Sequence, residues 1–222
     1  MVKKVSNEIK IEKLLTSWGI IVILWSLFRS GFSPPLWFNE LLAKPLIFLL
    51  PVFYFLKKNE PKTTFFKAIG IPKKNLIREI LLTLLLMFLI AGFGLLSIFT
   101  NKDINVVFLN KFDPQLLGSL LGLALASAFS EEIVGRGFLF NYLHKYSKNF
   151  ILSLFISSTL FFILYLPGGL TQNLSGQDLI MNLILNFTLS FITGIAFYLR
   201  KNLIPAIGVH AMIVFWFDLL LS

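Results

Sequence analysis

The chain has 222 residues, of which 56% are hydrophobic and only 14% are charged. In soluble domains roughly a quarter of all residues are charged. A soluble fold with the composition of this chain would therefore leave much apolar surface in water. The composition argues against a soluble enzyme, a nucleic-acid-binding domain and a disordered segment. It predicts a single membrane domain over residues 1–222, built from helices that cross the bilayer several times.

The formal net charge of +9 comes from lysine and arginine residues in short clusters between long apolar runs. Membrane proteins place basic residues in this way beside their spans. We therefore expect the lipid bilayer, and no nucleic acid, as the partner of these charges. The chain has no cysteine, which excludes disulfide bonds, a thiolate nucleophile and cysteine-bound metals.

The apolar runs predict an all-α transmembrane bundle with about seven spans. A bilayer core about 30 Å thick requires about 20 helical residues. The segments near this length are Leu14–Phe32, Leu36–Leu56, Asn75–Thr100, Pro114–Leu143, Phe150–Pro167, Asp178–Leu199 and Leu203–Ser222. Asp113 precedes the fourth of these and suits a helix N-cap, with proline at the first helical position.

Basic residues also predict the orientation of the bundle. They gather in the N-terminal tail, in the segment 57–79 and in the loops near Lys145 and Arg200, whereas the alternate loops carry few, among them Arg29. By the positive-inside rule, the N-terminus lies inside and the C-terminus outside.

The segment 57–79 is the longest polar stretch, and it contains Phe65, Phe66 and Ile69 among its lysines. Aromatic and aliphatic residues between basic ones are typical of segments that lie on anionic lipid. We expect a basic cytoplasmic loop or a short interfacial helix here.

The most informative residues are ionisable side chains inside the fourth span. Glu131, Glu132 and Arg136 lie at membrane depth, where charge is costly and marks a candidate functional site. Glu132 and Arg136 are four residues apart, so they share a helix face and can pair. Glu131 points about 100° away and has no local partner, which makes it a candidate general base or acid. The alternative is a structural Glu131 that is hydrogen-bonded to a neighbouring helix.

Polar side chains of other spans are expected at similar depth. A rise of about 1.5 Å per residue brings Tyr165 of the fifth span and His210 of the seventh into the inner to middle membrane, together with Glu131. The sixth span adds a polar stripe at helical spacing, formed by Asn186, Ser190 and Thr193. Such a stripe either holds helices together or lines a water-filled cavity.

Residues 114–222 resemble the core of the CAAX protease and bacteriocin-processing family (CPBP, or Abi) of intramembrane endopeptidases. The family's first motif, Glu-Glu-x-x-x-Arg, fits residues 131–136, with Gly135 where a phenylalanine is usual. The second motif, Phe-x-x-x-His, belongs at Phe161 and ends here in Tyr165 instead of histidine.

The family's last motif, His-x-x-x-Asn/Asp, belongs at His210 and ends here in Val214. The only other histidine, His144, lies near an inner loop and cannot restore the second motif. Asp218 is one helical turn beyond Val214 and cannot take its place.

The resemblance implies a hydrolytic site in which glutamate activates a water molecule. Carried over by position, Glu131 is the catalytic base, His210 an oxyanion donor, and Glu132 with Arg136 organises the site. Tyr165 supports the site, and the cavity would be lined by Phe161, Asn186, Ser190 and Val214. A zinc site needs three protein ligands, and only Glu131 and His210 are available, so we expect no metal and no other cofactor.

The two altered motifs weaken this chemistry. A phenol does not accept a proton at neutral pH as an imidazole does, so Tyr165 can only donate a hydrogen bond. Val214 offers no donor, and loss of one oxyanion donor typically costs about 100- to 1000-fold in rate. The residues predict a degenerate protease site.

We therefore expect a multi-pass protein of a bacterial cell membrane that is weakly catalytic or non-catalytic and binds a membrane protein or a peptide, as in bacteriocin immunity or as a scaffold. The alternative is an active intramembrane glutamyl endopeptidase, a hydrolase that processes a prenylated or leader peptide. A transporter or channel would need more convergent polar residues.

Two other charged residues inside the spans have simpler interpretations. Lys44 can reach the membrane surface or pair with Glu40 four residues earlier. Asp218 lies near the outer end of the last span, where we expect it to be solvated or hydrogen-bonded.

Overall fold

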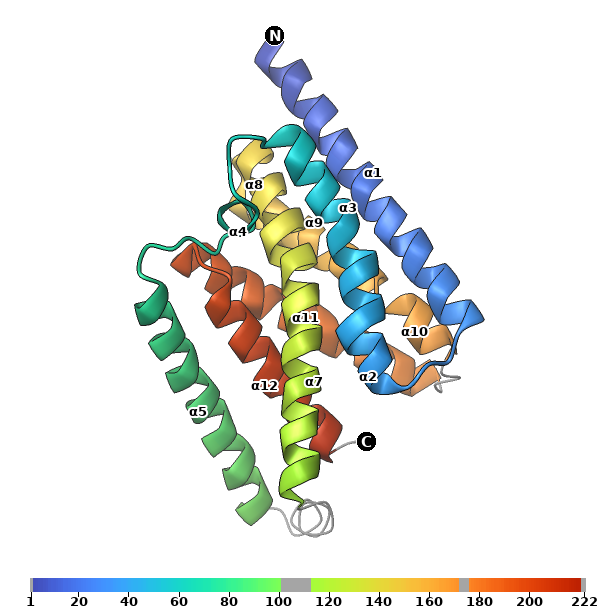
Figure 1. The fold of residues 1–222 in the computed structure, drawn as a ribbon, viewed down its shortest axis with the longest axis vertical. Helices are drawn as coiled ribbons and strands as arrows, with labels where there is room; N and C mark the ends of the chain where they lie inside the picture. The colour runs from blue at the N-terminus through green and yellow to red at the C-terminus, as the bar shows by residue number, and fades with distance from the viewer. Residues whose placement is uncertain (1, 101–112, 172–175, 221–222) are drawn as a thin grey trace.

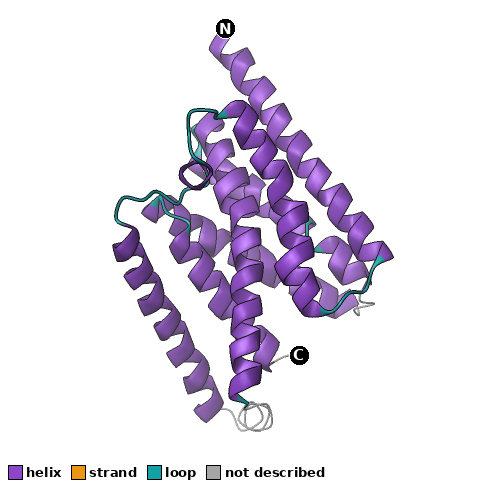
Figure 2. Cartoon of the chain, in the orientation of Figure 1, coloured by secondary structure: helices purple, strands orange, loops and turns teal. Residues whose placement is uncertain are grey.

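The computed structural model describes residues 2–100, 113–171 and 176–220, and within these ranges helices are connected by short loops, with no strand (Figures 1 and 2). In chain order the helices are α1 (Val2–Gly31), α2 (Leu36–Phe38), η1 (Asn39–Ala43), α3 (Lys44–Asn59), α4 (Phe65–Ala68), α5 (Leu76–Thr100), α7 (Pro114–Glu132), η2 (Ile133–Phe140), α8 (Asn141–Ser147), α9 (Phe150–Ile163), α10 (Leu166–Thr171), α11 (Gly176–Arg200) and α12 (Ile204–Leu220). The segments η1 and η2 are π-helical turns within two longer helices, α2–η1–α3 and α7–η2–α8.

The described helices match the predicted spans closely. Six stretches are long and apolar enough to cross a membrane: Lys10–Gly31, Leu36–Asn59, Leu76–Thr100, Pro114–Ser147, Phe150–Leu170 and Gly176–Arg200. A shorter apolar helix, Ile204–Leu219, lies at the seventh predicted span, whose last two residues, 221–222, are outside the described ranges. The prediction of a polytopic helical bundle is confirmed.

Side-chain caps fix where the helices around the site begin. The Asp113 carboxylate accepts a hydrogen bond from the backbone N–H of Gln115 at 2.9 Å, as its sequence position predicts. Between α8 and α9, Lys148 adopts a left-handed conformation with φ of 60°, and the Asn149 side chain accepts from the Leu152 N–H at 3.0 Å. This tight turn sends α9 back along η2.

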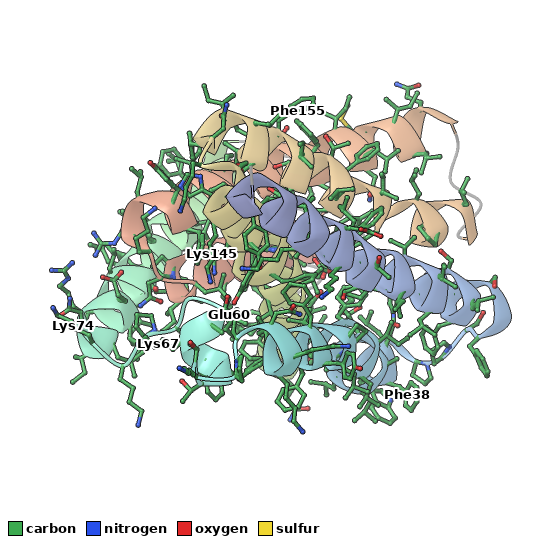
Figure 3. All side chains as sticks on the ribbon, turned by 90° about the horizontal axis from the view of Figure 1, so that it is seen from above. Phe38, Glu60, Lys67, Lys74, Lys145 and Phe155 are labelled. Carbon is green, nitrogen blue, oxygen red and sulfur yellow. The ribbon has the colours of Figure 1, made fainter. Side chains whose placement is uncertain are left out.

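The helix α7–η2 lies at the centre of the bundle (Figure 1). Helix α12 packs against α7, α5 and α11, while α9 packs against η2 and α11, and α1 packs against α3, α8 and α10. All eight residues of η2 are buried. Outward-facing apolar side chains surround this core, including Phe38 and Phe155 at opposite sides of the molecule in Figure 3. Such a surface suits lipid contact.

The segment 57–79 is only partly the surface loop that the sequence predicts. Lys67 and Lys74 are exposed and extend away from the bundle (Figure 3). Ile69, in contrast, is completely buried in the protein core, and the Gly70 carbonyl accepts a hydrogen bond from the Leu203 N–H at 2.8 Å. The prediction of an interfacial segment therefore does not hold for Ile69, because the turn after α4 inserts this residue between helices.

Glycine allows this insertion at Gly137 of η2. A Cβ atom on Gly137 would lie 2.8 Å from the Ile69 carbonyl oxygen, which is closer than real Cβ contacts. Only a residue without a side chain lets the loop approach the helix here. The loop after α4 thus supports the helix segment that follows Glu131 and Glu132.

Candidate functional site

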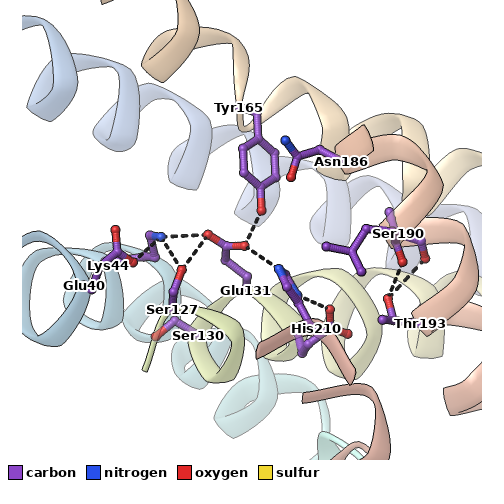
Figure 4. A network of polar contacts seen from close by, with 12 residues as sticks. Glu40, Lys44, Ser127, Ser130, Glu131, Tyr165, Asn186, Ser190, Thr193 and His210 are labelled. Atoms are coloured by element: carbon purple, nitrogen blue, oxygen red, sulfur yellow. Dashed lines mark hydrogen bonds and ion pairs between the residues drawn. The ribbon is translucent and has the colours of Figure 1, made fainter. Parts of the chain in front are cut away.

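Glu131 of α7 lies at the centre of a polar cluster to which α3, α12 and the turn between α9 and α10 also contribute (Figure 4). Its Oε1 atom accepts hydrogen bonds from Lys44 Nζ at 2.7 Å and from Ser127 Oγ at 3.2 Å. Its Oε2 atom accepts a hydrogen bond from the Tyr165 hydroxyl and lies 3.4 Å from Nε2 of His210. The prediction that Glu131 has no local partner is wrong, because Ser127, one turn earlier in the same helix, donates to it. The other three groups come from other parts of the chain.

Lys44 is the residue of this cluster whose role sequence reasoning missed. It pairs with Glu40, as predicted from their spacing, but its ammonium also donates to Ser127 at 2.7 Å and to Glu131. The side chain is only 6% exposed, so it does not reach the membrane surface. The sequence contained a signal for this role, because a lysine in the middle of an apolar span marks a candidate functional residue. Its partner, however, is 87 positions away in the sequence.

The π-helical turn η1 ends immediately before Lys44 and contains Asn39 and Glu40. Such turns are frequent at functional sites, because one extra residue re-aims the side chains around it. All three residues are more than nine-tenths buried. The second span therefore presents a compact polar group to Glu131 from outside the predicted motifs.

Glu132 forms a second buried pair beside the first. Its Oε1 atom lies 3.1 Å from Nη1 of Arg136, as the four-residue spacing predicts, and 2.6 Å from Nδ1 of His210. The Arg136 guanidinium also lies over the Phe161 ring, with 4.6 Å between its central carbon and the ring centroid. Glu132, Arg136 and His210 are each 1% exposed or less. The arrangement leaves little freedom for any of them to move.

His210 of α12 connects the two glutamates. One ring nitrogen faces Glu132 and the other faces Glu131. The expected convergence of Glu131, Tyr165 and His210 from three spans is present in the structure. Both imidazole nitrogens are directed at carboxylates instead of at open space.

Tyr165 lies where α9 ends and α10 begins. The backbone turns at this point, with the Tyr165 N–H bonded to the Phe162 carbonyl at 3.0 Å. The Phe161 and Tyr165 rings meet edge to face with centroids 5.4 Å apart. A Cβ atom at Gly135 would lie 3.0 Å from the Phe161 ring. Gly135 therefore leaves room for this ring.

The polar stripe of α11 does not join the cluster. The Asn186 amide donates to the carbonyl and side-chain oxygens of Asn182, both at 2.9 Å, and the Thr193 hydroxyl donates to the Leu189 carbonyl at 2.9 Å. Ser190 is buried in the same helix. Only Asn186 of the three lines a cavity beside Glu131.

Two cavities adjoin the cluster, with volumes of about 490 Å³ and 710 Å³. The smaller one lies among α1, α2–α3, α9 and α10 and includes the predicted lining residue Phe161. The larger one reaches α11 and α12 and includes Val214 and Asp218. The side chains common to both cavities are Leu36, Glu40, Lys44, Glu131, Tyr165 and Asn182. A ligand in either cavity would therefore contact the polar cluster.

The site contains three acidic side chains, two basic side chains and an imidazole. Lys44 connects Glu40 with Glu131, and Arg136 pairs with Glu132. In the described part of the chain, no three histidine, aspartate or glutamate side chains are grouped to hold a metal ion. The arrangement offers hydrogen-bond donors and acceptors to a ligand at the two cavities.

Residues 113–216 match the sequence profile of the family described as Type II CAAX prenyl endopeptidase Rce1-like. The match confirms the resemblance predicted from the motifs. No curated protein and no solved structure matches the chain. Residues 113–216 are thus a CAAX-protease-like region of a multi-pass membrane protein. Glu131 and His210 lie within the matched region, whereas Glu40 and Lys44 lie outside it.

Proposed function

We propose that this protein is a CAAX-protease-like membrane protein with a degenerate site, which binds a peptide or a membrane protein and hydrolyses peptide bonds weakly or not at all. The observation that carries this proposal is the set of four groups around the Glu131 carboxylate. Bacteriocin immunity and scaffolding of an envelope enzyme are two roles of this kind.

A general base must contact the water molecule from which it takes a proton. An ionised carboxylate offers about four lone-pair positions, and Lys44 and Ser127 donate to one oxygen of Glu131 while Tyr165 donates to the other. His210 lies beside that second oxygen. A water nucleophile would have to displace one of these groups before Glu131 could act on it.

The other two requirements of the reaction are also weakened. No imidazole stands beside Glu131 on the α9 side, because Tyr165 occupies that position and donates a proton where the reaction needs an acceptor. Both nitrogens of His210 face glutamates, and Val214 has no hydrogen-bond donor. Loss of one oxyanion donor alone slows acyl transfer about 100- to 1000-fold.

The second candidate function is an active intramembrane glutamyl endopeptidase that processes a prenylated or leader peptide. One observation favours it: Glu131 lines both cavities, so a substrate that enters either one reaches the carboxylate. A substrate that displaces Lys44 or Tyr165 would free Glu131 for water. Glu131 would then be the base and His210 the oxyanion donor.

Purified protein in liposomes, mixed with prenylated and leader-peptide substrates, separates the two functions. We expect no cleavage by the unmodified protein, and peptide binding that persists in Glu131→Gln. A variant that combines Tyr165→His with Val214→Asn restores both motif positions and is expected to cleave faster than the unmodified chain. Tyr165→Phe with Val214→Ala is the matched control. Cleavage by the unmodified protein that Glu131→Gln abolishes would overturn the proposal.

A further inference from the structure

The smaller cavity contains two buried polar atoms that have no partner among the described residues. One is Nε of Arg29, in the last turn of α1, and the other is Oδ1 of Asn39, in η1. Both residues line this cavity. A buried donor and a buried acceptor without hydrogen bonds are costly for a folded protein. A group bound in this cavity can supply a partner to each of the two atoms.

Arg29 differs from a basic residue that only reaches the membrane surface. Its guanidinium makes no ion pair or hydrogen bond within the described ranges, and its central carbon lies 5.9 Å from the centroid of the Trp25 ring. Lys44 lies at the same distance from that ring. Trp25 is 6% exposed. The free cation is thus held against a buried indole near the polar cluster.

Asn39 is 93% buried, because only 7% of its surface is exposed. Its amide nitrogen donates to the neighbouring Glu40 at 3.4 Å, while its oxygen remains available as an acceptor. The missing partner of this oxygen is an N–H or O–H group. The missing partner of Arg29 is an acceptor, and a carboxylate matches a guanidinium best in charge and shape.

We propose that the smaller cavity binds a peptide through one of its carboxylates, with Arg29 pairing with the carboxylate and Asn39 accepting a hydrogen bond from a peptide N–H. The carboxylate is either the C-terminal one or an acidic side chain. This inference rests on the proposed function, since it states which part of the bound peptide the protein recognises. Both residues lie outside the region matched by the family profile.

The walls of the cavity favour a peptide over a phospholipid. Aromatic and aliphatic side chains such as Phe48, Phe161 and Leu164 suit the side chains of an apolar peptide. Glu40, Lys44 and Glu131 line the same cavity, and an acyl chain of a lipid would have to lie against these charges. A peptide backbone carries polar groups along its whole length and can remain hydrogen-bonded there.

Binding of a fluorescent hexapeptide of leucine and alanine tests this proposal. The peptide is made with a free C-terminal carboxylate, with a C-terminal amide, and as an amide with one leucine replaced by aspartate. Each is titrated into the full chain in phosphatidylcholine vesicles, with protein-free vesicles as the blank. We expect at least one carboxylate form to bind about tenfold or more tightly than the plain amide, and the form that does identifies the source of the carboxylate.

Variants of Arg29 and Asn39 show which of the two residues causes the preference for a carboxylate peptide. Arg29→Gln should abolish the difference between carboxylate and amide forms, while Arg29→Lys should keep part of it. Arg78→Gln, at an arginine whose side chain is 67% exposed, should keep all of it. Asn39→Ala should weaken the carboxylate and amide forms equally. Thermal unfolding of each variant checks that the protein remains folded.

Three results would overturn the inference. Equal binding of all forms to the unmodified protein would show that no carboxylate is recognised, and it would leave the proposed function standing. Displacement of the carboxylate peptide by dihexanoyl phosphatidylglycerol at lower concentration than by unlabelled peptide would identify a lipid headgroup site. Absence of binding by every form would contradict the proposed function as well.

Discussion

The ammonium of Lys44 lies 2.7 Å from Oε1 of Glu131, although the two residues are 87 positions apart. This contact joins the second span to the centre of the candidate site. It also connects Glu131 to Glu40, because Lys44 pairs with both.

Lys44→Met is expected to destabilise the protein by about 3–5 kcal/mol, because it leaves two buried carboxylates without their cation. Combining it with Glu131→Gln removes one of those carboxylates, so the joint effect should be smaller than the sum by about 1–3 kcal/mol. Chemical unfolding in detergent micelles gives the free energy of unfolding of the two single variants and of the double variant. Lys67→Met, at an exposed lysine, is the control, and it should change stability by less than about 0.5 kcal/mol. Strictly additive effects would contradict the direct pairing.

Arg136→Met should be among the most destabilising single changes in the chain. Its ion pair with Glu132 has both side chains 2% exposed or less, so the change leaves a buried charge at a cost of about 3–5 kcal/mol. Arg78→Met removes an ion pair with Glu79 that is 67% exposed on the arginine side, and it should cost less than about 1 kcal/mol. The unfolding midpoints of Arg136→Met and Arg78→Met compare the two losses of stability. Similar shifts would show that burial does not set the strength of these pairs.

Gly137→Ala is expected to destabilise the protein by about 1–3 kcal/mol, because the new methyl group would overlap the Ile69 carbonyl. Gly122→Ala, in α7 of the same continuous helix, is the matched control. A Cβ atom there meets nothing within 4 Å, and alanine favours the helix by about 0.5–1 kcal/mol. The midpoint of thermal unfolding should therefore fall in Gly137→Ala and rise in Gly122→Ala. Equal shifts would argue against insertion of the loop beside η2.

Tyr165→Phe removes the hydroxyl that donates to Glu131. Hydrogen bonds to charged groups contribute about 1.5–3 kcal/mol, so we expect a loss of this size in the free energy of unfolding. Tyr54→Phe, at a tyrosine that is 66% exposed, should have almost no effect. The two variants are compared in the same unfolding assay, and a wild-type stability for Tyr165→Phe would mean that the hydroxyl does not hold Glu131.

Sequence patterns predicted the parts of the site that depend on one helix. The four-residue spacing of Glu132 and Arg136 gave their pairing, and helix rise gave the common depth of Tyr165 and His210 with Glu131. These relationships follow from helix geometry alone. The span limits were also close, since apolar length is set by the bilayer.

The contacts that the sequence did not predict cross between elements. Lys44 could be paired with Glu40 by spacing, but its contact with Glu131 depends on how the second and fourth spans pack. Ile69 looked like a lipid-facing residue among lysines, and only the loop path inserts it into the core. Periodicity carries no information on which helix faces are neighbours, so these contacts required the structure.

Whether the site is degenerate is tested most directly by counting product molecules per protein molecule under stoichiometric conditions. Protein in liposomes is incubated with an equal amount of prenylated or leader peptide, and cleavage products are quantified by mass spectrometry. We expect the unmodified protein and Glu131→Gln to yield the same background level, far below one product per protein. Product approaching one per protein in the unmodified chain, and background in Glu131→Gln, would contradict it and establish an active glutamyl endopeptidase.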